Sequence, residues 1–284
     1  MRSASFGIYE KALPALRGWP EKLDAAATAG FDFVEMSVDD DERRLNRLDW
    51  SSDQRSLVRE ASANSGVRLQ TIILSAHRKY PLGSVTPAIR ELAVDILKRA
   101  VDLTADIGAR IIQLAGYYVF YEKHDAGSRH RFLENLQRGL ERASKAGVML
   151  GIETMDGEDV TSVEKAMKIV AEVNSPWLQV YPDVGNLAAN GLDVAAELRL
   201  GAGHLVGIHL KDTKPVEYRR VPFGEGIVPF REVFQTLNEI GYDGGYLVEM
   251  WNDDAPDAMH IITSARFWLE DRMNDARVVQ ANAI

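Results

Sequence analysis

The chain has 284 residues, of which 46% are hydrophobic and 26% charged, and these proportions are typical of a folded globular protein with a full core. Its net charge of −9 and pI near 5.3 argue against a broad electrostatic surface for nucleic acid or for an anionic membrane. Because the sequence contains no cysteine, disulfides, thiolate metal sites and cysteine nucleophiles are excluded.

Eight short β-branched or apolar runs predict strands, in chain order at residues 5–9, 32–37, 68–74, 110–115, 149–154, 178–183, 206–210 and 246–250. Amphipathic helical patterns lie between them, including residues 87–107, 129–146, 163–173, 230–240 and 256–273. Glycines that suit helix C-termini precede several strands, namely Gly30, Gly66, Gly108, Gly147 and Gly241. We expect the tail after Met273 to be loose.

The regular alternation of strand and helix predicts a parallel sheet with right-handed crossovers. Eight such units favour a single-domain (β/α)8 TIM barrel over residues 1–284, with an open doubly wound sheet as the alternative. No GxGxxG or GxxxxGK[ST] loop follows any predicted strand, which argues against dinucleotide and P-loop sites.

The N-terminal stretch does not have the pattern of a secretory signal. The first apolar stretch is interrupted at Glu10 and Lys11, too early for the hydrophobic region of a secretory signal. No run approaches the roughly 18 apolar residues of a membrane-spanning helix. We therefore expect a cytoplasmic protein without a membrane partner.

Four metal-ligand residue types stand at the ends of consecutive predicted strands, namely Glu153, Asp183, His209 and Glu249. In a barrel of this kind the chemistry lies at the carboxyl ends of the strands. Apolar residues such as Ile152 flank these positions and suit the helix-covered face, so the four side chains are predicted to face inward. Gly151 and Gly207 share that inward parity, which we expect to leave space beneath the site.

Three carboxylates and one imidazole suit a divalent cation with open positions for substrate oxygens. The set leans toward Mn²⁺, with Mg²⁺, Co²⁺ and Zn²⁺ as alternatives. The competing interpretation is that each residue forms a buried ion pair, for example with Lys211, or caps a loop. Any one position alone favours that interpretation, but all four together favour the metal site. Other histidines are expected to be structural or solvated: His124, His130, His204 and His260.

The segments IETMD, YPDVGN, HLKDTKP, VPFGEG and LVEMW resemble the xylose-isomerase-like superfamily of sugar epimerases. LSAHRKYPLGS, RLDWSSDQR and IQLAGYYVFYE resemble its L-ribulose-5-phosphate (L-xylulose-5-phosphate) 3-epimerase subgroup, so the resemblance spans nearly the whole chain. It implies an isomerase of pentose phosphate metabolism and L-ascorbate degradation, which interconverts L-ribulose 5-phosphate and L-xylulose 5-phosphate. It also implies a homo-oligomer, a dimer, with no nucleic-acid partner.

The resemblance implies that the four residues bind one divalent metal and that Glu153 and Glu249 act as acid and base on opposite sides of the sugar carbon. Inverting a carbon beside a ketone requires removing its proton and returning one to the other face. The C2 and C3 oxygens of the sugar would chelate the metal, which would stabilise a cis-enediolate. Which glutamate begins as the base stays open.

Two positions depart from related ketose 3-epimerases, which carry a histidine where Asn186 stands and an arginine where Lys214 and Pro215 stand. Lys211 and Lys214 are candidate replacements. For the phosphate, His77, Arg78 and Lys79 follow the third strand, and Lys214, Arg219 and Arg220 follow the seventh, with Lys11 a weaker candidate. Nearby aromatic residues are expected to wall the cavity or to pack: Tyr117, Tyr118, Phe120, Tyr121 and Trp251.

Three other functions remain open at this level. A sugar (hexulose) phosphate isomerase or a polyol-ketone dehydratase would use the same metal site. A nuclease resembling endonuclease four would need further ligands, and the first four strands offer chiefly Glu10, Glu35 and His77. A catalytically inactive barrel used for binding is disfavoured by the intact ligand set.

Overall fold

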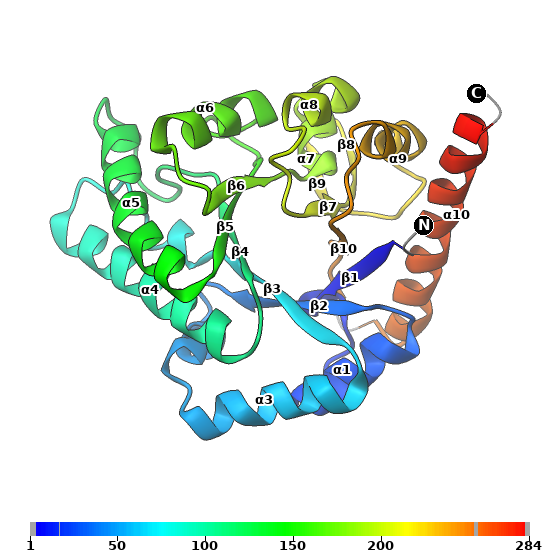
Figure 1. The fold of residues 1–284 in the computed structure, drawn as a ribbon, viewed down its shortest axis with the longest axis horizontal. Helices are drawn as coiled ribbons and strands as arrows, with labels where there is room; N and C mark the ends of the chain where they lie inside the picture. The colour runs from blue at the N-terminus through cyan, green and yellow to red at the C-terminus, as the bar shows by residue number, and fades with distance from the viewer. Residues whose placement is uncertain (1–3, 17, 253–254, 282–284) are drawn as a thin grey trace.

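The computed structural model describes residues 4–16, 18–252 and 255–281, with side chains as far as residue 277. Within this part of the chain, eight parallel strands form one sheet in the order β6-β5-β4-β3-β2-β1-β10-β7. Their bounds are β1 Ser5–Tyr9, β2 Phe33–Val38, β3 Arg68–Leu74, β4 Ile111–Ala115, β5 Met149–Glu153, β6 Leu178–Tyr181, β7 Ile208–Leu210 and β10 Gly245–Val248. Figure 1 shows these strands at the centre of the molecule, with the helices around them.

The two edge strands of this sheet approach each other and nearly close the barrel. Isolated parallel bridges join Val180 to Leu205 and Asp183 to His209. Backbone hydrogen bonds from Val206 N to Val180 O (3.0 Å) and from His209 N to Pro182 O (2.9 Å) span the same seam. The (β/α)8 prediction is therefore confirmed.

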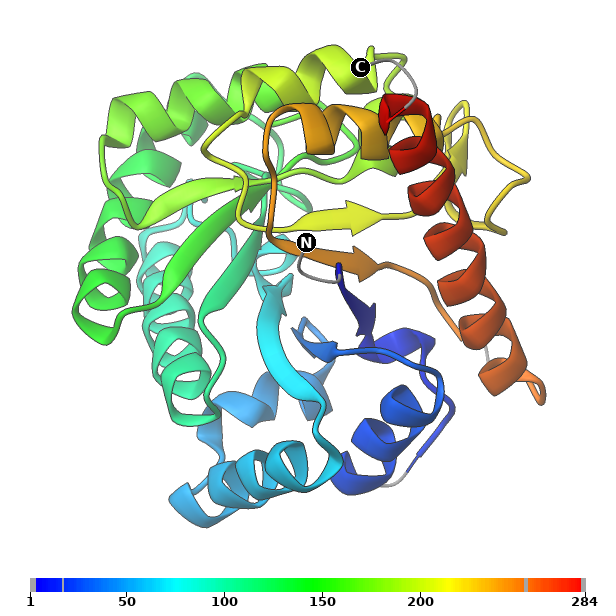
Figure 2. The same cartoon turned by 45° about the vertical axis from the view of Figure 1, so that its right-hand side comes forward.

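The helices cover the outside of the barrel, and in Figure 2 the long α10 lies beyond β7 and β10. The longer ones are α1 Trp19–Thr28, α3 Ser52–Ser65, α4 Pro87–Asp106, α5 Ser128–Ala146, α6 Val163–Val173, α8 Val194–Leu200, α9 Phe230–Glu239 and α10 Ala258–Ala281. Short elements at the strand ends are η1 Glu10–Ala12, α2 Glu42–Leu45, η2 Asn46–Asp49, η3 Ala76–Arg78, α7 Val184–Ala189 and the antiparallel hairpin β8 Asp212–Lys214 with β9 Glu217–Val221.

Local sequence explains where several helices begin and end. Ser51 and Gln54 form a reciprocal capping box at the start of α3. Gly66 and Gly147 end α3 and α5 with φ values of 73° and 67°, a conformation in which a side chain would be strained. The expectation of a loose tail after Met273 is wrong, because α10 continues to Ala281. Ala276 is fully buried, so the apolar face of the helix extends beyond Met273.

The core has two layers, as the alternation of side chains along the strands requires. The larger layer packs residues such as Ile8, Val34 and Val248 against the helices. Their strand neighbours Tyr9, Phe33, Ile73 and Leu247 form a second, smaller cluster that faces the barrel axis. Gly7 leaves room for one of these rings, because a Cβ at this position would lie 2.1 Å from the Phe33 ring. The site described next rests on this packed floor.

None of the helices in the described ranges combines the length and the apolar composition needed to cross a bilayer.

Candidate active site

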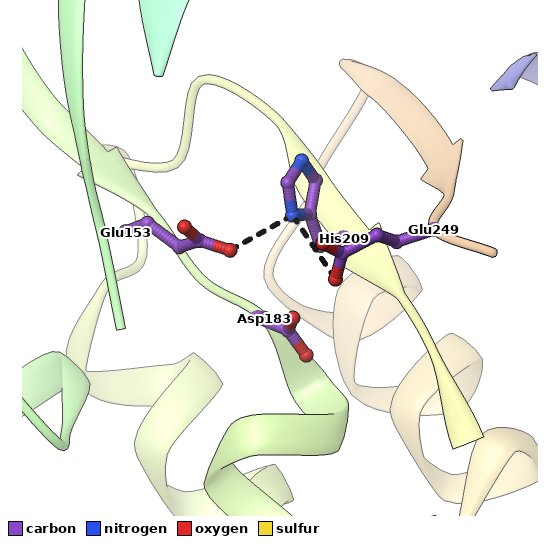
Figure 3. A group of neighbouring side chains, drawn as sticks. All are labelled: Glu153, Asp183, His209 and Glu249. Carbon is purple, nitrogen blue, oxygen red and sulfur yellow. Dashed lines mark hydrogen bonds and ion pairs between the residues drawn. The ribbon is translucent and has the colours of Figure 1, made fainter. Parts of the chain in front are cut away.

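The four predicted ligands converge at the carboxyl ends of their strands, as Figure 3 shows. Glu153 is the last residue of β5, and His209 lies in β7. Asp183 follows β6 and caps α7, its side chain accepting a hydrogen bond from Asn186 N at 2.9 Å. Glu249 directly follows β10, and its backbone N donates to Leu210 O at 2.9 Å. One potential ligand atom from each lies within 4.8 Å of all the others.

The cluster is buried and densely charged. The exposed fractions of Glu153, Asp183, His209 and Glu249 are 2%, 0%, 0% and 7%. His209 Nδ1 lies 2.9 Å from Glu153 Oε1 and 3.8 Å from Glu249 Oε2. Lys211 enters from the other side, with its Nζ 2.6 Å from Asp183 Oδ2 and 2.9 Å from Glu249 Oε2. The three carboxylates therefore share two neighbours, the Lys211 ammonium and the His209 imidazole, which can carry a positive charge.

The electrostatic environments of the carboxylates differ. Burial raises the pKa of Asp183 to about 7, although the Lys211 ammonium opposes the shift. Burial also raises the pKa of Glu153, against the opposing charge of His209. Burial acts to raise the pKa of Glu249 as well, but the charges of Lys211 and His209 outweigh it and hold that pKa at about 2. The electrostatic environments of the two glutamates therefore shift their pKa values in opposite directions.

The donor set fits a divalent cation. Asp183 Oδ2 is buried and accepts no hydrogen bond from any described group, although it is ion-paired with Lys211. Carboxylate and imidazole ligands bind such metals at about 2.0–2.2 Å, so atoms sharing one ion lie at most roughly 4.4 Å apart. The observed 4.8 Å limit needs only small side-chain adjustments to meet that value.

A pocket opens above the cluster. Its lining consists of Ile73, Arg78, Glu153, Met155, Asp156, Asn186, Lys211, Tyr218, Arg219 and Glu249. Four of the residues predicted to contact substrate are in this list: Arg78, Asn186, Lys211 and Arg219. The Arg78 guanidinium lies 5.9 Å from the Tyr117 ring centroid and 5.6 Å from that of Phe120, and its buried Nε has no hydrogen-bond partner in the described chain. Arg78 is thus held by aromatic contacts, with donors left for a ligand.

The described lining of this pocket does not include the other predicted contacts, namely His77, Lys79, Lys214, Arg220 and Lys11. His77 is buried, with its Nε2 3.1 Å from the Ala93 carbonyl oxygen. Lys79 is exposed and stacks on Tyr80, and Lys214 ends β8.

The aromatic residues expected around the cavity divide into two groups. Trp251 walls the site, because Lys211 Nζ and the Arg219 guanidinium lie 5.9 and 5.7 Å from its ring centroid. Tyr117 packs on Phe120, Tyr118 packs on Phe132, and Tyr121 is 65% exposed.

A second hollow is lined in part by Trp251 and contains four cationic side chains. Lys11, Lys22, Arg43 and Arg44 line it, together with Glu10, Leu13, Pro14, Ala15, Leu16, Trp251 and Asn252. Sequence analysis singled out Lys11 alone among these four cations. The adjacent pair Arg43 and Arg44 in an acidic protein was the signal that could have pointed here.

Sequence analysis also missed side chains beneath the ligands. The space expected beside Gly151 and Gly207 is filled by Tyr181, since a Cβ on Gly207 would lie 2.4 Å from that ring. The Tyr181 ring meets His209 edge-on at 4.8 Å between ring centroids. Gln113 Nε2 donates to Glu153 Oε2, and Glu35 lies beside His209. These contacts hold the ligand side chains from within the barrel.

The family model described as "Xylose isomerase-like TIM barrel" matches residues 23–272. The chain belongs to the xylose isomerase-like TIM-barrel family. It is 48% identical over 275 residues to the L-ribulose-5-phosphate 3-epimerase UlaE of Escherichia coli O157:H7 strain EC4115, covering 97% of each chain. The same values hold for the UlaE of Escherichia fergusonii. The family resemblance inferred from sequence is confirmed.

Solved structures of sugar 3-epimerases have the same fold at low sequence identity. An L-ribulose 3-epimerase structure superposes with a TM-score of 0.83 at 20% identity, covering 99% of this chain and 98% of that one. A D-psicose 3-epimerase from Clostridium cellulolyticum H10, solved with D-tagatose, gives 0.82 at 16% identity, with 95% and 99% covered. At these identities the likeness shows the fold alone.

Proposed function

We propose that this chain is a metal-dependent 3-epimerase that interconverts L-ribulose 5-phosphate and L-xylulose 5-phosphate. The observation that carries the proposal is the meeting of Glu153 and Glu249, two buried carboxylates from β5 and the end of β10, at one cluster with His209 and Asp183. The 48% identity to enzymes named L-ribulose-5-phosphate 3-epimerase, over 97% of their length, supports the substrate class.

The proposed ligands of one divalent cation are Glu153, Asp183, His209 and Glu249, and Mn²⁺ is the proposed ion, with Mg²⁺, Co²⁺ or Zn²⁺ as alternatives. When bound, such an ion supplies a Lewis acid that polarises a ketone and offsets negative charge that develops beside it.

The proton transfers are assigned to the two glutamates. One carboxylate removes the proton from the carbon beside the ketone, and the other carboxyl group delivers a proton to the opposite face. Burial raises the pKa of Glu153, whereas the charges of Lys211 and His209 lower that of Glu249, so the two carboxyl groups lie in different electrostatic environments. Their roles as base and acid exchange between the forward and the reverse reaction. Gln113, which donates to Glu153 Oε2, fixes the orientation of that carboxyl group.

The pocket side chains bind and orient the sugar. Asn186 is held by its Nδ2 bond to Thr154 O at 2.9 Å, which leaves its amide oxygen for a substrate hydroxyl. Lys211 places its ammonium between Asp183 and Glu249 at the base of the pocket. These two residues suit the carbons next to the ketone.

The phosphate end has two candidate positions. Arg78 and Arg219 line the pocket itself, and guanidinium groups match phosphate geometry. The second hollow, lined in part by Trp251, contains Lys11, Lys22, Arg43 and Arg44. Lys11, Lys22 and Arg44 are ion-paired with Glu10 or Asp39, so an anion there would share these cations with two carboxylates. His77, Lys79 and Lys214 are weaker candidates, because they line neither space in the described chain.

Two further statements complete the proposal. We place the enzyme in the cytoplasm because charged sugar phosphates do not cross membranes unaided, and we propose a homodimer from the family resemblance. A place in L-ascorbate degradation follows from the proposed substrates.

The decisive experiment incubates a panel of ketose 5-phosphates with the Mn²⁺-loaded protein in deuterium oxide, followed by EDTA treatment and NMR of the sugars. Deuterium at C3, with no loss of water and no movement of the carbonyl, is the expected result. A shifted carbonyl would indicate an aldose–ketose isomerase, and loss of water a dehydratase. Cleavage of an abasic-site oligonucleotide would indicate the nuclease alternative. If none of the panel exchanges, the proposed function is wrong.

A further inference from the structure

Glu35 is a fully buried carboxylate that the proposed proton transfers do not use. Its Oε1 lies 3.0 Å from His209 Nε2, and its Oε2 accepts a hydrogen bond from Thr71 Oγ1 at 2.8 Å. Each oxygen thus has its own partner, and neither partner is a permanent cation. Burying a carboxylate without a lysine or arginine partner costs free energy of folding. Such a residue is therefore a candidate for a role besides packing.

An irregularity in the sheet places Glu35 and Thr71 side by side. The register of β2 with β3 pairs Val34 with Leu69 but Glu35 with Thr71, so Gln70 is skipped. Without this shift Glu35 would pair with Gln70 and not with Thr71. Bulges of this kind redirect side chains next to functional sites. The shift therefore gives Glu35 a fixed hydrogen-bond donor on the neighbouring strand.

The contact with Glu35 determines which nitrogen of His209 faces the other ligands. Since Nε2 faces the Glu35 carboxylate, that nitrogen carries a proton, and Nδ1 is directed toward Glu153 at 2.9 Å and Glu249 at 3.8 Å. The Tyr181 ring, edge-on to His209, blocks one side of the imidazole. These contacts fix the orientation of the imidazole ring, with Nε2 toward Glu35 and Nδ1 toward the other proposed ligands.

We propose that Glu35 is a positioning residue that orients His209 so that Nδ1, and not Nε2, binds the metal. Carboxylates that accept the second N–H of a metal-bound histidine fix its tautomer and raise its basicity. The inference rests on the proposed metal site but not on the sugar substrate. Glu35 touches neither the pocket nor the other three ligands in the described chain.

The first experiment measures metal affinity alone, by competition between the protein and a chelator for Zn²⁺. Glu35→Ala removes the acceptor and is expected to weaken binding about 10-fold to 100-fold. Glu35→Gln keeps an acceptor oxygen without the charge and is expected to lose less, about 10-fold at most. Thr71→Val is the matched control, because it removes the other hydrogen bond of Glu35 but leaves the carboxylate beside His209. Its affinity should stay within about threefold of the wild type.

The second experiment observes the imidazole directly, in Zn²⁺-loaded protein carrying ¹⁵N-labelled histidine. The wild type and Thr71→Val should show a slowly exchanging Nε2–H of His209 with a metal-bound Nδ1. Glu35→Ala should lose that protected proton. If Glu35→Ala does not fold, Glu35→Gln decides, since its zinc affinity must then fall measurably below that of Thr71→Val.

Three results would overturn the proposal. One is zinc affinity in the folded Glu35 variants equal to that of the wild type. Another is a zinc-bound Nε2 in the wild type. The third is a wild type that binds no metal, which would also remove the proposed ligand set. A failed epimerase assay with intact zinc binding would contradict the proposed function while leaving this inference standing.

Discussion

The ammonium of Lys211 lies 2.6 Å from Asp183 Oδ2 and the pair is buried at the base of the pocket. The positive charge of Lys211 therefore lies against a carboxylate that the proposed metal would also use. Before an ion binds, Lys211 is the nearest fixed positive charge to both Asp183 and Glu249.

Substitution Lys211→Met should make the metal-free protein depend on the ion for stability. Removing one partner of a buried charge pair costs about 3–5 kcal/mol, because the remaining carboxylates stay buried and uncompensated. Thermal unfolding with and without Mn²⁺ should show a larger metal-induced rise in Tm for Lys211→Met than for the wild type. The exposed Lys79→Met is the control, and an equal rise in all three proteins would contradict this account.

Glu153 and Glu249 should be needed for turnover but not for folding. Glu153→Gln and Glu249→Gln each remove one acid–base group and should lower kcat by about 100-fold to 10,000-fold, with circular dichroism unchanged. Glu164→Gln, an exposed carboxylate paired with Lys168 on α6, is the matched control and should keep full turnover. Wild-type kcat in either site variant would remove that glutamate from the mechanism.

Metal removal should abolish turnover and lower stability together. EDTA followed by desalting should eliminate activity, and Mn²⁺ should restore it. At an ion concentration of 100 times Kd, binding adds about 2.7 kcal/mol to the free energy of unfolding. His209→Ala should shift the Mn²⁺ concentration needed for half-maximal activity upward. Full activity in the presence of EDTA, with no metal detected by elemental analysis, would refute a metal-dependent reaction.

Phosphate recognition can be assigned by comparing a sugar phosphate with its unphosphorylated analogue. If the phosphate contacts Arg78, Arg78→Ala should raise KM for the sugar phosphate about 10-fold to 100-fold and for the analogue far less. Arg43→Ala and Arg44→Ala make the same test of the second hollow. The exposed Arg138→Ala, remote on α5, is the control. Equal KM changes for both sugars would exclude a phosphate role for the arginine that was replaced.

The burial of His77 predicts that the free energy of unfolding decreases at acidic pH. Burial lowers the pKa of His77 to about 4, against 6.5 for an ordinary histidine. Because the unfolded chain takes up this proton first, the full contribution is present above pH 6.5 and is lost as the pH falls toward 4. The loss amounts to about 3 kcal/mol. Urea unfolding at several pH values should show that the free energy of unfolding depends less steeply on pH in His77→Asn than in the wild type. The exposed His130→Asn should keep the wild-type slope.

The strand positions were predictable because buried parallel strands are short continuous apolar runs bounded by polar residues. The two predicted strands that contain Asp183 and Glu249 extended two residues too far, because these polar ligands already lie beyond the strand ends. The clustering of the four ligand types was predictable for the same reason, since parallel strands bring their carboxyl ends together.

The supporting side chains were not predictable from the sequence. Glu35 meets His209 across a separation of 174 residues, and the register shift beside Gln70 has no clear local sequence signal. The Tyr181 side chain fills space that two glycines on the neighbouring strands leave open, which depends on how these strands are staggered. The hairpin β8–β9, which brings Tyr218 and Arg219 over the pocket, follows loop geometry that hydrophobic periodicity does not report.

At the seam between β6 and β7, the proposed ion would stabilise the barrel as well as take part in the reaction. In the described chain, isolated bridges hold these strands where other neighbours share continuous ladders. Asp183 and His209, which form one of those bridges, are also two of the four proposed ligands. A single ion held by both side chains would fasten the two free edges of the sheet, so amide hydrogens along β6 and β7 should exchange more slowly once the metal is loaded.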